Sequence, residues 1–518
     1  MSDPESSGDR AVVSGATVRL PDSLAGWLMV FGPGAIVASL TIGTGELIFS
    51  TRGGAIFGYR ILFVFLLISL LKWGLVMASA RHIVLTGVHP YERMLSLPGP
   101  RGWLPCTLFL IAAICMPVWV SFHSGVLGNM ASWLTGTSGR LGGAVDYLWG
   151  ALFLAGVLTL SATSGYDVLE RVQIVIVLTM VFCAGMTLVL YRPDWLGLLA
   201  GAVIPPSLEY PDWLPKAYPE IARHSPWVET TRYVGVIGGA GFDYMVYTTF
   251  LREKNWGRAG LGPVTAAELS AIAEDPGHSV RRWVLAPAID LTISFALVVG
   301  FSAVFVASGT MILGPQHRIP GEENMLGMQA EFVMGIHPWL LPLYVIGALL
   351  TMVGTLYGTL EVACSIALEM FHSADHRFAM QHKTKIRRAV IAWCAVWAAA
   401  VLVWLFVYQS SGAAGRPRQL LALLTPINLF TGVLGCGIFC WLLVWMDRRF
   451  LPPALRMPAA LLVLNSISGV IFLGLGLKGT WDAESRLVSL CGLAVLLAAG
   501  WLAAIVIDSR LRRRSAGG

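Results

Sequence analysis

Long apolar runs recur along the whole chain, and they constrain its fold more than any other feature of the sequence. Each run is about 20 or more residues long, enough for an α-helix to cross roughly 30 Å of hydrocarbon. Of the 518 residues, 56% are apolar and only 13% are charged, whereas a soluble domain has about 25% charged residues. The sequence therefore predicts an all-α integral membrane protein with about 12 transmembrane helices. The predicted spans are residues 25–57, 60–83, 103–133, 145–164, 168–191, 231–251, 283–312, 339–371, 387–409, 419–446, 455–477 and 485–508.

The distribution of basic residues predicts how these helices are oriented. Most of the 36 Lys and Arg residues fall in the two tails and in the loops that follow spans two, four, six, eight and ten. Cytoplasmic loops carry an excess of Lys and Arg, so both termini are expected in the cytoplasm, in a multi-pass protein of the cell (inner) membrane. Residues 1–24 are expected to form a cytoplasmic tail without a cleavable signal peptide, and residues 509–518 a basic cytoplasmic tail.

Two of the predicted spans contain a break at corresponding positions. Span one carries Gly43, Thr44 and Gly45 followed by Glu46, and span six reads VGVIGGAGFDYMVYTTFL, in which four glycines precede Asp243. Each glycine destabilises a helix interior by roughly 1 kcal/mol relative to alanine, so neither span is expected to be one continuous helix. Breaks in the first and sixth helices are typical of transporters built from two inverted repeats of five helices. The alternative is that these glycines only allow neighbouring helices to pack closely.

The breaks bring together groups that can bind an ion. Carbonyl groups freed by a break can coordinate a cation, while the N-terminal end of the resumed half-helix favours an anion. Glu46 and Asp243 follow the two breaks, and acids inside a membrane are candidates for a functional site. Their carboxylates are hard oxygen ligands of the kind that Mg²⁺ and Mn²⁺ prefer. The alternative is that each carboxylate only caps its half-helix.

Four further ionisable residues lie at membrane depth: Lys72, His123, Asp290 and Glu361. We interpret Lys72 and Asp290 first as structural residues, the lysine either reaching the membrane surface or pairing with an acid inside the bundle. His123 could relay a proton, although a lone histidine in an apolar helix is more often a packing residue. For Asp290 and Glu361, a proton relay and a structural role both stay open.

Four stretches of the chain resemble helices of the Nramp family of proton-coupled divalent metal transporters. "FGPGAIVASLTIGTGE" resembles the family's first helix, "GYDVLERVQIVIVL" its fifth, "IDLTISFAL" its seventh and "IGALLTMVGTLYGTLEVACSIALEMF" its eighth. The resemblance implies a LeuT-type fold, in which 5+5 inverted repeats place broken helices 1 and 6 around the substrate. The implied transporter core is 25–446, with repeat one at 25–191 and repeat two at 231–446. Residues 455–508 would be two peripheral transmembrane helices.

The chain departs from the family at the metal site. The family's DPGN motif in helix 1 falls on Gly43, Thr44, Gly45 and Glu46, so its Asp is lost and a carboxylate stands three positions later.

The second break departs as well. The family's MPH motif in helix 6 falls on Phe242, Asp243 and Tyr244, which removes the soft thioether ligand that suits transition metals. The acid of helix 3 and the histidines of helix 6 that the family associates with proton movement are also missing.

These observations predict a secondary transporter that moves a divalent metal cation, favouring a hard ion such as Mg²⁺ or Mn²⁺, by alternating access. Weak or no proton coupling is expected, whereas the family itself works by metal–proton symport. Glu46 and Asp243 are the predicted metal ligands. The other predicted substrate-binding residues are Gly43, Thr44, Gly45, Gly239, Phe242 and Asn428.

Two alternatives stay open. "IGTGEL" also resembles the first helix of amino-acid and organocation transporters of the same superfamily (APC), which would imply transport of an amino acid or another small cationic or zwitterionic solute. A membrane sensor or scaffold on a transporter fold is the third possibility, but it predicts a large soluble domain that the sequence lacks.

Composition gives no indication of a cofactor, an enzyme or a nucleic-acid partner. The eight cysteines contain no CxxC pair, so neither a disulfide framework nor a structural zinc site is predicted. The net charge of +6 follows from the bias of the loops and does not indicate nucleic-acid binding. The expected partners of a monomeric chain are the lipid bilayer and a small ion.

Overall fold

The chain folds into helices, and ten segments within the described residues are long and apolar enough to cross a membrane. The first of them, Glu46–Thr86, joins the second half of span one to span two. The protein is therefore a multi-pass membrane protein, as predicted. This computed structural model describes residues 23, 26, 31–163, 166–223, 225–319, 337, 339–411, 427–482 and 486–516. The predicted N-terminal tail, apart from residue 23, lies outside these residues.

Spans one and six are each broken, as the glycine clusters predict. The first consists of α2 (Pro33–Thr41) and α3 (Thr44–Phe57). The sixth consists of α12 (Pro226–Val236) and α13 (Gly241–Glu253). In both, the chain leaves the helix for a few residues and then resumes it, so four half-helices end near the two breaks.

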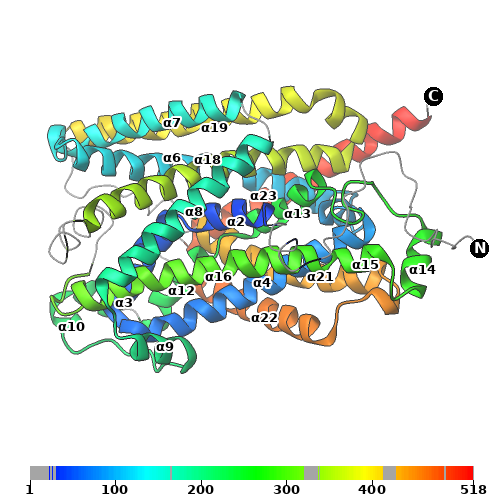
Figure 1. Ribbon diagram of the computed structural model, residues 1–518. Coiled ribbons are helices and arrows are strands. Elements are labelled where there is room, and N and C mark those ends of the chain that lie inside the picture. The colour runs from blue at the N-terminus through cyan, green and yellow to red at the C-terminus, as the bar shows by residue number, and fades with distance from the viewer. Residues whose placement is uncertain are drawn as a thin grey trace, which may run out of the picture.

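Four long helices form a layer on one side of the broken helices. They are α6 (Trp103–Leu134), α7 (Val145–Thr163), α18 (Leu340–Ala374) and α19 (His376–Ser410). Every pair among these helices is in contact, and Figure 1 shows them running side by side along the top of the view. They are the third and fourth spans of each of the two predicted repeats. α19 begins at His376 rather than at 387, because the Asp375 side chain caps it by accepting a hydrogen bond from the Phe378 amide (3.0 Å).

Two long helices flank the broken ones on the other side. α4 (Ile61–Thr86) packs against α13, and α16 (Leu285–Ser308) packs against α2 and α3. Each predicted repeat therefore supplies one helix that packs against the broken helix of the other predicted repeat. α8 (Tyr166–Tyr191) contacts α2 and α18.

The last described helices complete the bundle. The tenth span is η4 (Leu429–Leu434) continued by α21 (Gly435–Phe450), and it packs against α12 and α13. α22 (Ala459–Asp482) lies against α21 and α4, and α23 (Arg486–Ala516) lies against α6. The short elements are η1 (Gly58–Arg60), α5 (Pro90–Met94), η2 (Arg140–Gly143), α9 (Trp195–Val203), α10 (Leu214–Ala217), α11 (Pro219–Ala222), α14 (Ala266–Glu274), α15 (Ser279–Trp283), η3 (Gly309–Leu313) and η5 (Pro453–Leu455).

Two of the predicted ionisable residues hold helices together. The Asp290 carboxylate on α16 accepts hydrogen bonds from the Gly32 amide (3.0 Å) and from the Tyr247 hydroxyl on α13 (2.7 Å). Glu361 on α18 pairs with Arg387 on α19, whose guanidinium donates to both carboxylate oxygens at 2.6 and 2.7 Å. These contacts support the structural reading of both acids.

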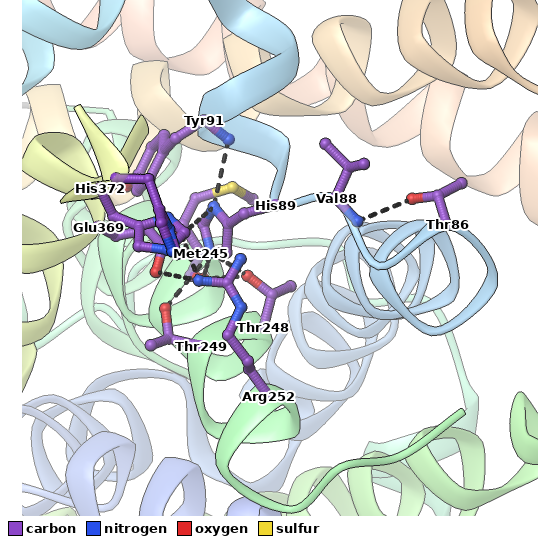
Figure 2. Close-up of polar contacts among 11 residues, drawn as sticks. Thr86, Val88, His89, Tyr91, Met245, Thr248, Thr249, Arg252, Glu369 and His372 are labelled. Carbon is purple, nitrogen blue, oxygen red and sulfur yellow. Dashed lines mark hydrogen bonds and ion pairs between the residues drawn. The ribbon is translucent and has the colours of Figure 1, made fainter. Parts of the chain in front are cut away.

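A polar cluster joins α13 to α18 and α5 (Figure 2). Arg252 on α13 donates to both carboxylate oxygens of Glu369 on α18, at 2.8 and 3.0 Å. His89, just before α5, lies fully buried beside them, with Nε2 3.2 Å from the Met245 carbonyl oxygen and 2.5 Å from the Thr248 hydroxyl. The cluster fixes the far half of the sixth span against the four-helix layer.

His89 should make the stability of the protein depend on pH. Burial, and then the nearby Arg252 charge, lower the pKa of His89 well below its usual range. Below about pH 6.5 the unfolded chain binds a proton at this histidine that the folded chain does not bind, so stability falls as the pH falls. Between pH 7.5 and 5.5 the loss is about 1.4 kcal/mol for this group alone.

The measurement is the melting temperature of the detergent-solubilised protein across this pH range. His89→Gln should flatten the pH dependence, whereas His382→Gln, at a partly exposed position on α19, should leave it unchanged. Equal slopes for the wild type and His89→Gln would contradict the assignment.

Candidate functional site

A single carboxylate connects the two helix breaks. The Gly43 amide, at the first break, donates to Oε2 of Glu46 (3.1 Å). The Gly238 amide, at the second break, donates to Oε1 of the same side chain (3.0 Å). Glu46 is fully buried, with 1% of its surface exposed. It therefore caps α3, as one of the sequence alternatives proposed, and in addition ties α3 to the end of α12.

The second break is shaped by two glycines. Gly238 and Gly239 have φ angles of 79° and 87°, in the left-handed region where a side chain is strained. A Cβ atom on Gly239 would lie 2.4 Å from Cγ2 of Thr41, so this position also has no room for a side chain. The Ala240 amide then donates to Oδ2 of Asp243 (2.7 Å), which caps α13. Each predicted acid is thus the cap of the half-helix that follows its break.

The carbonyl groups of the second break also have partners. Nζ of Lys72, which comes from the middle of α4, donates to the carbonyl oxygens of Ile237 and Gly239, both at 2.6 Å. The Tyr244 hydroxyl donates to the carbonyl oxygen of Gly238. Sequence reasoning identified Lys72 as a membrane-depth residue but did not predict these partners, because contacts between distant helices leave no local sequence signal.

A small cavity of about 70 Å³ lies at the breaks. That volume accommodates an ion with a few water molecules. Most of the predicted site residues line it together, namely Gly43, Glu46, His123, Gly239, Phe242 and Asp243. Asp243 is the more exposed of the two acids, since it is only partly buried. His123 stacks on Trp119, with ring centroids 5.6 Å apart and an angle of 20° between the planes.

Four threonines that the sequence did not single out also line the cavity: Thr41, Thr355, Thr359 and Thr431. Each hydroxyl donates to a backbone carbonyl three or four residues earlier in its own helix, over 2.8 to 3.2 Å. A hydroxyl whose hydrogen is used in this way still has oxygen lone pairs to offer. The threonines therefore add hydrogen-bond acceptors to the cavity rather than donors.

The remaining predicted residues are placed differently. Asn428 is not among the residues that line the cavity. It lies between α12 and η4, where a Cβ atom on Gly235 would be 2.9 Å from its Oδ1 and one on Gly432 would be 2.7 Å away. Thr44 and Gly45 begin α3, but the burial of both residues and the Thr44 side chain lie outside what the structure describes.

The donor set is small for a metal ion. Within the part of the chain that the structure describes, no three His, Cys, Asp or Glu side chains come close enough to hold a metal together. Glu46 and Asp243 are the two acids of the cavity, and both oxygens of Glu46 already accept amide hydrogens. A bound ion would therefore rely on Asp243, the threonine oxygens and water.

Comparison with known proteins finds similarity in structure but not in sequence. No protein-family model matches the chain, and no curated protein matches it by sequence.

Among solved structures, the manganese transporter of Eremococcus coleocola, in complex with an aromatic bis-isothiourea substituted compound, is similar with a TM-score of 0.66 at 15% identity, over 95% of this chain and 98% of that one. A variant of the same transporter has a TM-score of 0.64 at 14% identity, over 96% of this chain and 98% of that one. MhsT in complex with L-phenylalanine has a TM-score of 0.50 at 12% identity, over 88% of this chain and 98% of that one.

The similarity extends over almost the whole length of each matched structure. It confirms the fold that the sequence resemblance implies, at an identity too low to carry over a substrate. The chain has the LeuT-type transporter fold, with its candidate site at the breaks of the first and sixth helices.

Proposed function

We propose that this protein is a secondary transporter that moves a small cation by alternating access, with a hard divalent ion such as Mg²⁺ or Mn²⁺ as the favoured cargo. The observation that carries the proposal is the acceptor-rich cavity at the two breaks, lined by Asp243, Glu46 and four threonine oxygens. Mg²⁺ keeps several of its waters and binds proteins through one or two carboxylates, which suits a cavity in which Asp243 has one oxygen without an amide partner and Glu46 has none.

The hydrogen bonds of the backbone amides at the breaks support a cation rather than an amino acid as the substrate. In transporters of this architecture, amides at the half-helix N-termini point at the anionic group of the substrate. Here the amides of Gly43 and Gly238 donate to Glu46, and the Ala240 amide donates to Asp243. A substrate carboxylate would have to displace these side chains and would then be close to two negative charges. Transport of an amino acid or another zwitterion is therefore the less supported alternative.

Asp243→Asn should abolish most of the transport while keeping the fold. The asparagine oxygen still accepts the Ala240 amide, but the charge that faces the cavity is gone. Two unit charges 4 Å apart attract by about 4 kcal/mol at an effective dielectric constant of 20, and 1.4 kcal/mol corresponds to a factor of ten. We therefore expect the initial rate of Mn²⁺ or Mg²⁺ entry into proteoliposomes, each ion assayed alone with a fluorescent indicator, to fall at least tenfold.

The matched control for that experiment is Asp447→Asn, which changes a buried acid outside the cavity. Asp447 accepts the Met457 amide (2.9 Å), so the substitution tests the loss of a buried charge without altering the cavity. The control should keep the wild-type rate. Wild-type rates in Asp243→Asn, or wild-type exchange of L-phenylalanine with no flux of either metal, would refute the metal assignment.

Metal entry should proceed without stoichiometric movement of protons. The third span carries no Asp or Glu, and Tyr244 stands where the resembling family has a histidine. A pH-sensitive dye inside the proteoliposomes should record no acidification beyond that of protein-free vesicles while Mn²⁺ enters. Acidification that scales with the amount of Mn²⁺ taken up would show that another group, with His123 as the first candidate, carries the proton.

A further inference from the structure

Lys72 places a positive charge inside the break of the sixth helix. Its side chain is fully buried, with none of its surface exposed, although it belongs to a different helix, α4. Its Nζ atom lies 2.6 Å from the carbonyl oxygen of Ile237 and 2.6 Å from that of Gly239. These two residues flank Gly238, where the backbone leaves the helical path.

The two carbonyls would have other partners in an unbroken helix. Each would accept a hydrogen bond from the amide four residues later. The break removes those amides from reach and leaves two carbonyl oxygens in the interior of a membrane protein, where an unpaired polar group is costly. Transporters with this kind of break use such freed carbonyls to coordinate a coupling ion such as Na⁺.

An ammonium group can bind these carbonyl oxygens in place of that ion. It is compact, carries one positive charge and has three donors, so it can satisfy two carbonyls at once. The short contacts to two oxygens resemble the partial shell of a bound monovalent cation. The ammonium also interacts electrostatically with Glu46, Asp243 and Cys436, the titratable groups that face it.

Simpler roles for Lys72 do not account for its position. A lysine that reaches toward the membrane surface would have an exposed amine, whereas this one is fully buried. A lysine that serves as a salt-bridge partner would contact an acid, but among the described residues no carboxylate oxygen lies within 4.0 Å of its Nζ. Its direct partners are the two carbonyls.

We propose that the Lys72 ammonium replaces a coupling cation at the break of the sixth helix, so that the transporter works without Na⁺ bound to these carbonyls. The inference rests on the proposed transport function. The Lys72 charge also offsets one of the two carboxylate charges, those of Glu46 and Asp243, beside the cavity. Lys72 is thereby a residue that sets which cations the site accepts, without itself touching the cargo.

Lys72→Met tests the proposal, because methionine has a similar length but no charge. The purified proteins are melted in NaCl and in N-methyl-D-glucamine chloride at equal ionic strength. The wild type should melt at the same temperature in both salts. In the Na⁺-free buffer, Lys72→Met should melt several degrees below the wild type. As Na⁺ replaces N-methyl-D-glucamine, its melting temperature should rise and level off after most of that loss has been recovered. Lys72→Arg, which keeps the charge, should stay independent of Na⁺.

Lys478→Met is the matched control, since that lysine is largely exposed near the end of α22 and should show no Na⁺ dependence. If Lys72→Met can be purified only when Na⁺ is present throughout, that result also supports the proposal.

Three results would overturn it: a wild type that Na⁺ stabilises saturably, a Lys72→Met variant that is equally unstable or unrecoverable in both salts, and a Lys72→Arg variant that depends on Na⁺. Melting requires no transported cargo, so these outcomes are independent of whether Mn²⁺ or Mg²⁺ is carried.

Discussion

Backbone groups that a helix break exposes inside a bilayer need partners within the protein, and this requirement organises the whole site. Water is not available in the hydrocarbon region to hydrogen-bond them. Here the amides on the N-terminal side of each resumed half-helix donate to Glu46 or Asp243, and the carbonyls of the second break accept from Lys72 and Tyr244. The flanking helices α4 and α16, and the four-helix layer beyond them, hold these partners in position. The oxygens left to bind a ligand are those without a partner at the breaks, namely one oxygen of Asp243 and the threonine hydroxyl oxygens of the cavity.

The sequence was sufficient to predict the breaks and their acids but not the partners that reach them from elsewhere. Clustered glycines weaken a helix locally, and a carboxylate three residues after the cap position is also a local pattern. The two breaks, and Glu46 and Asp243 as their caps, could therefore be predicted from short stretches of sequence. Lys72 and the four cavity threonines come from helices far apart in the chain, and their meeting depends on packing. Asn428 shows the converse limit, because its register was estimated from the resemblance and it lies between two helices instead of in the cavity.

The fold and the chemistry of the site are separable in this protein. Apolar spans, short connections and close-packed glycines specify a LeuT-type bundle that superposes on transporters at 15% identity or less. Few residues line the cavity at the breaks, so they contribute little to an overall structural similarity. This is why the fold could be recognised through weak sequence resemblance, whereas the roles of Phe242 and Asp243 have to be inferred from the cavity that they line.

The bridge through Glu46 has a mechanical consequence. The Glu46 carboxylate accepts an amide hydrogen from each of the two breaks and so ties them together. A movement that separated α3 from the end of α12 would break one of these buried hydrogen bonds, and leaving a buried amide without a partner costs about 1–3 kcal/mol. Arg52 on α3 and Glu229 on α12 reinforce the link with an ion pair at 2.5 Å. We therefore expect α3 and α12 to move together when the transporter changes conformation.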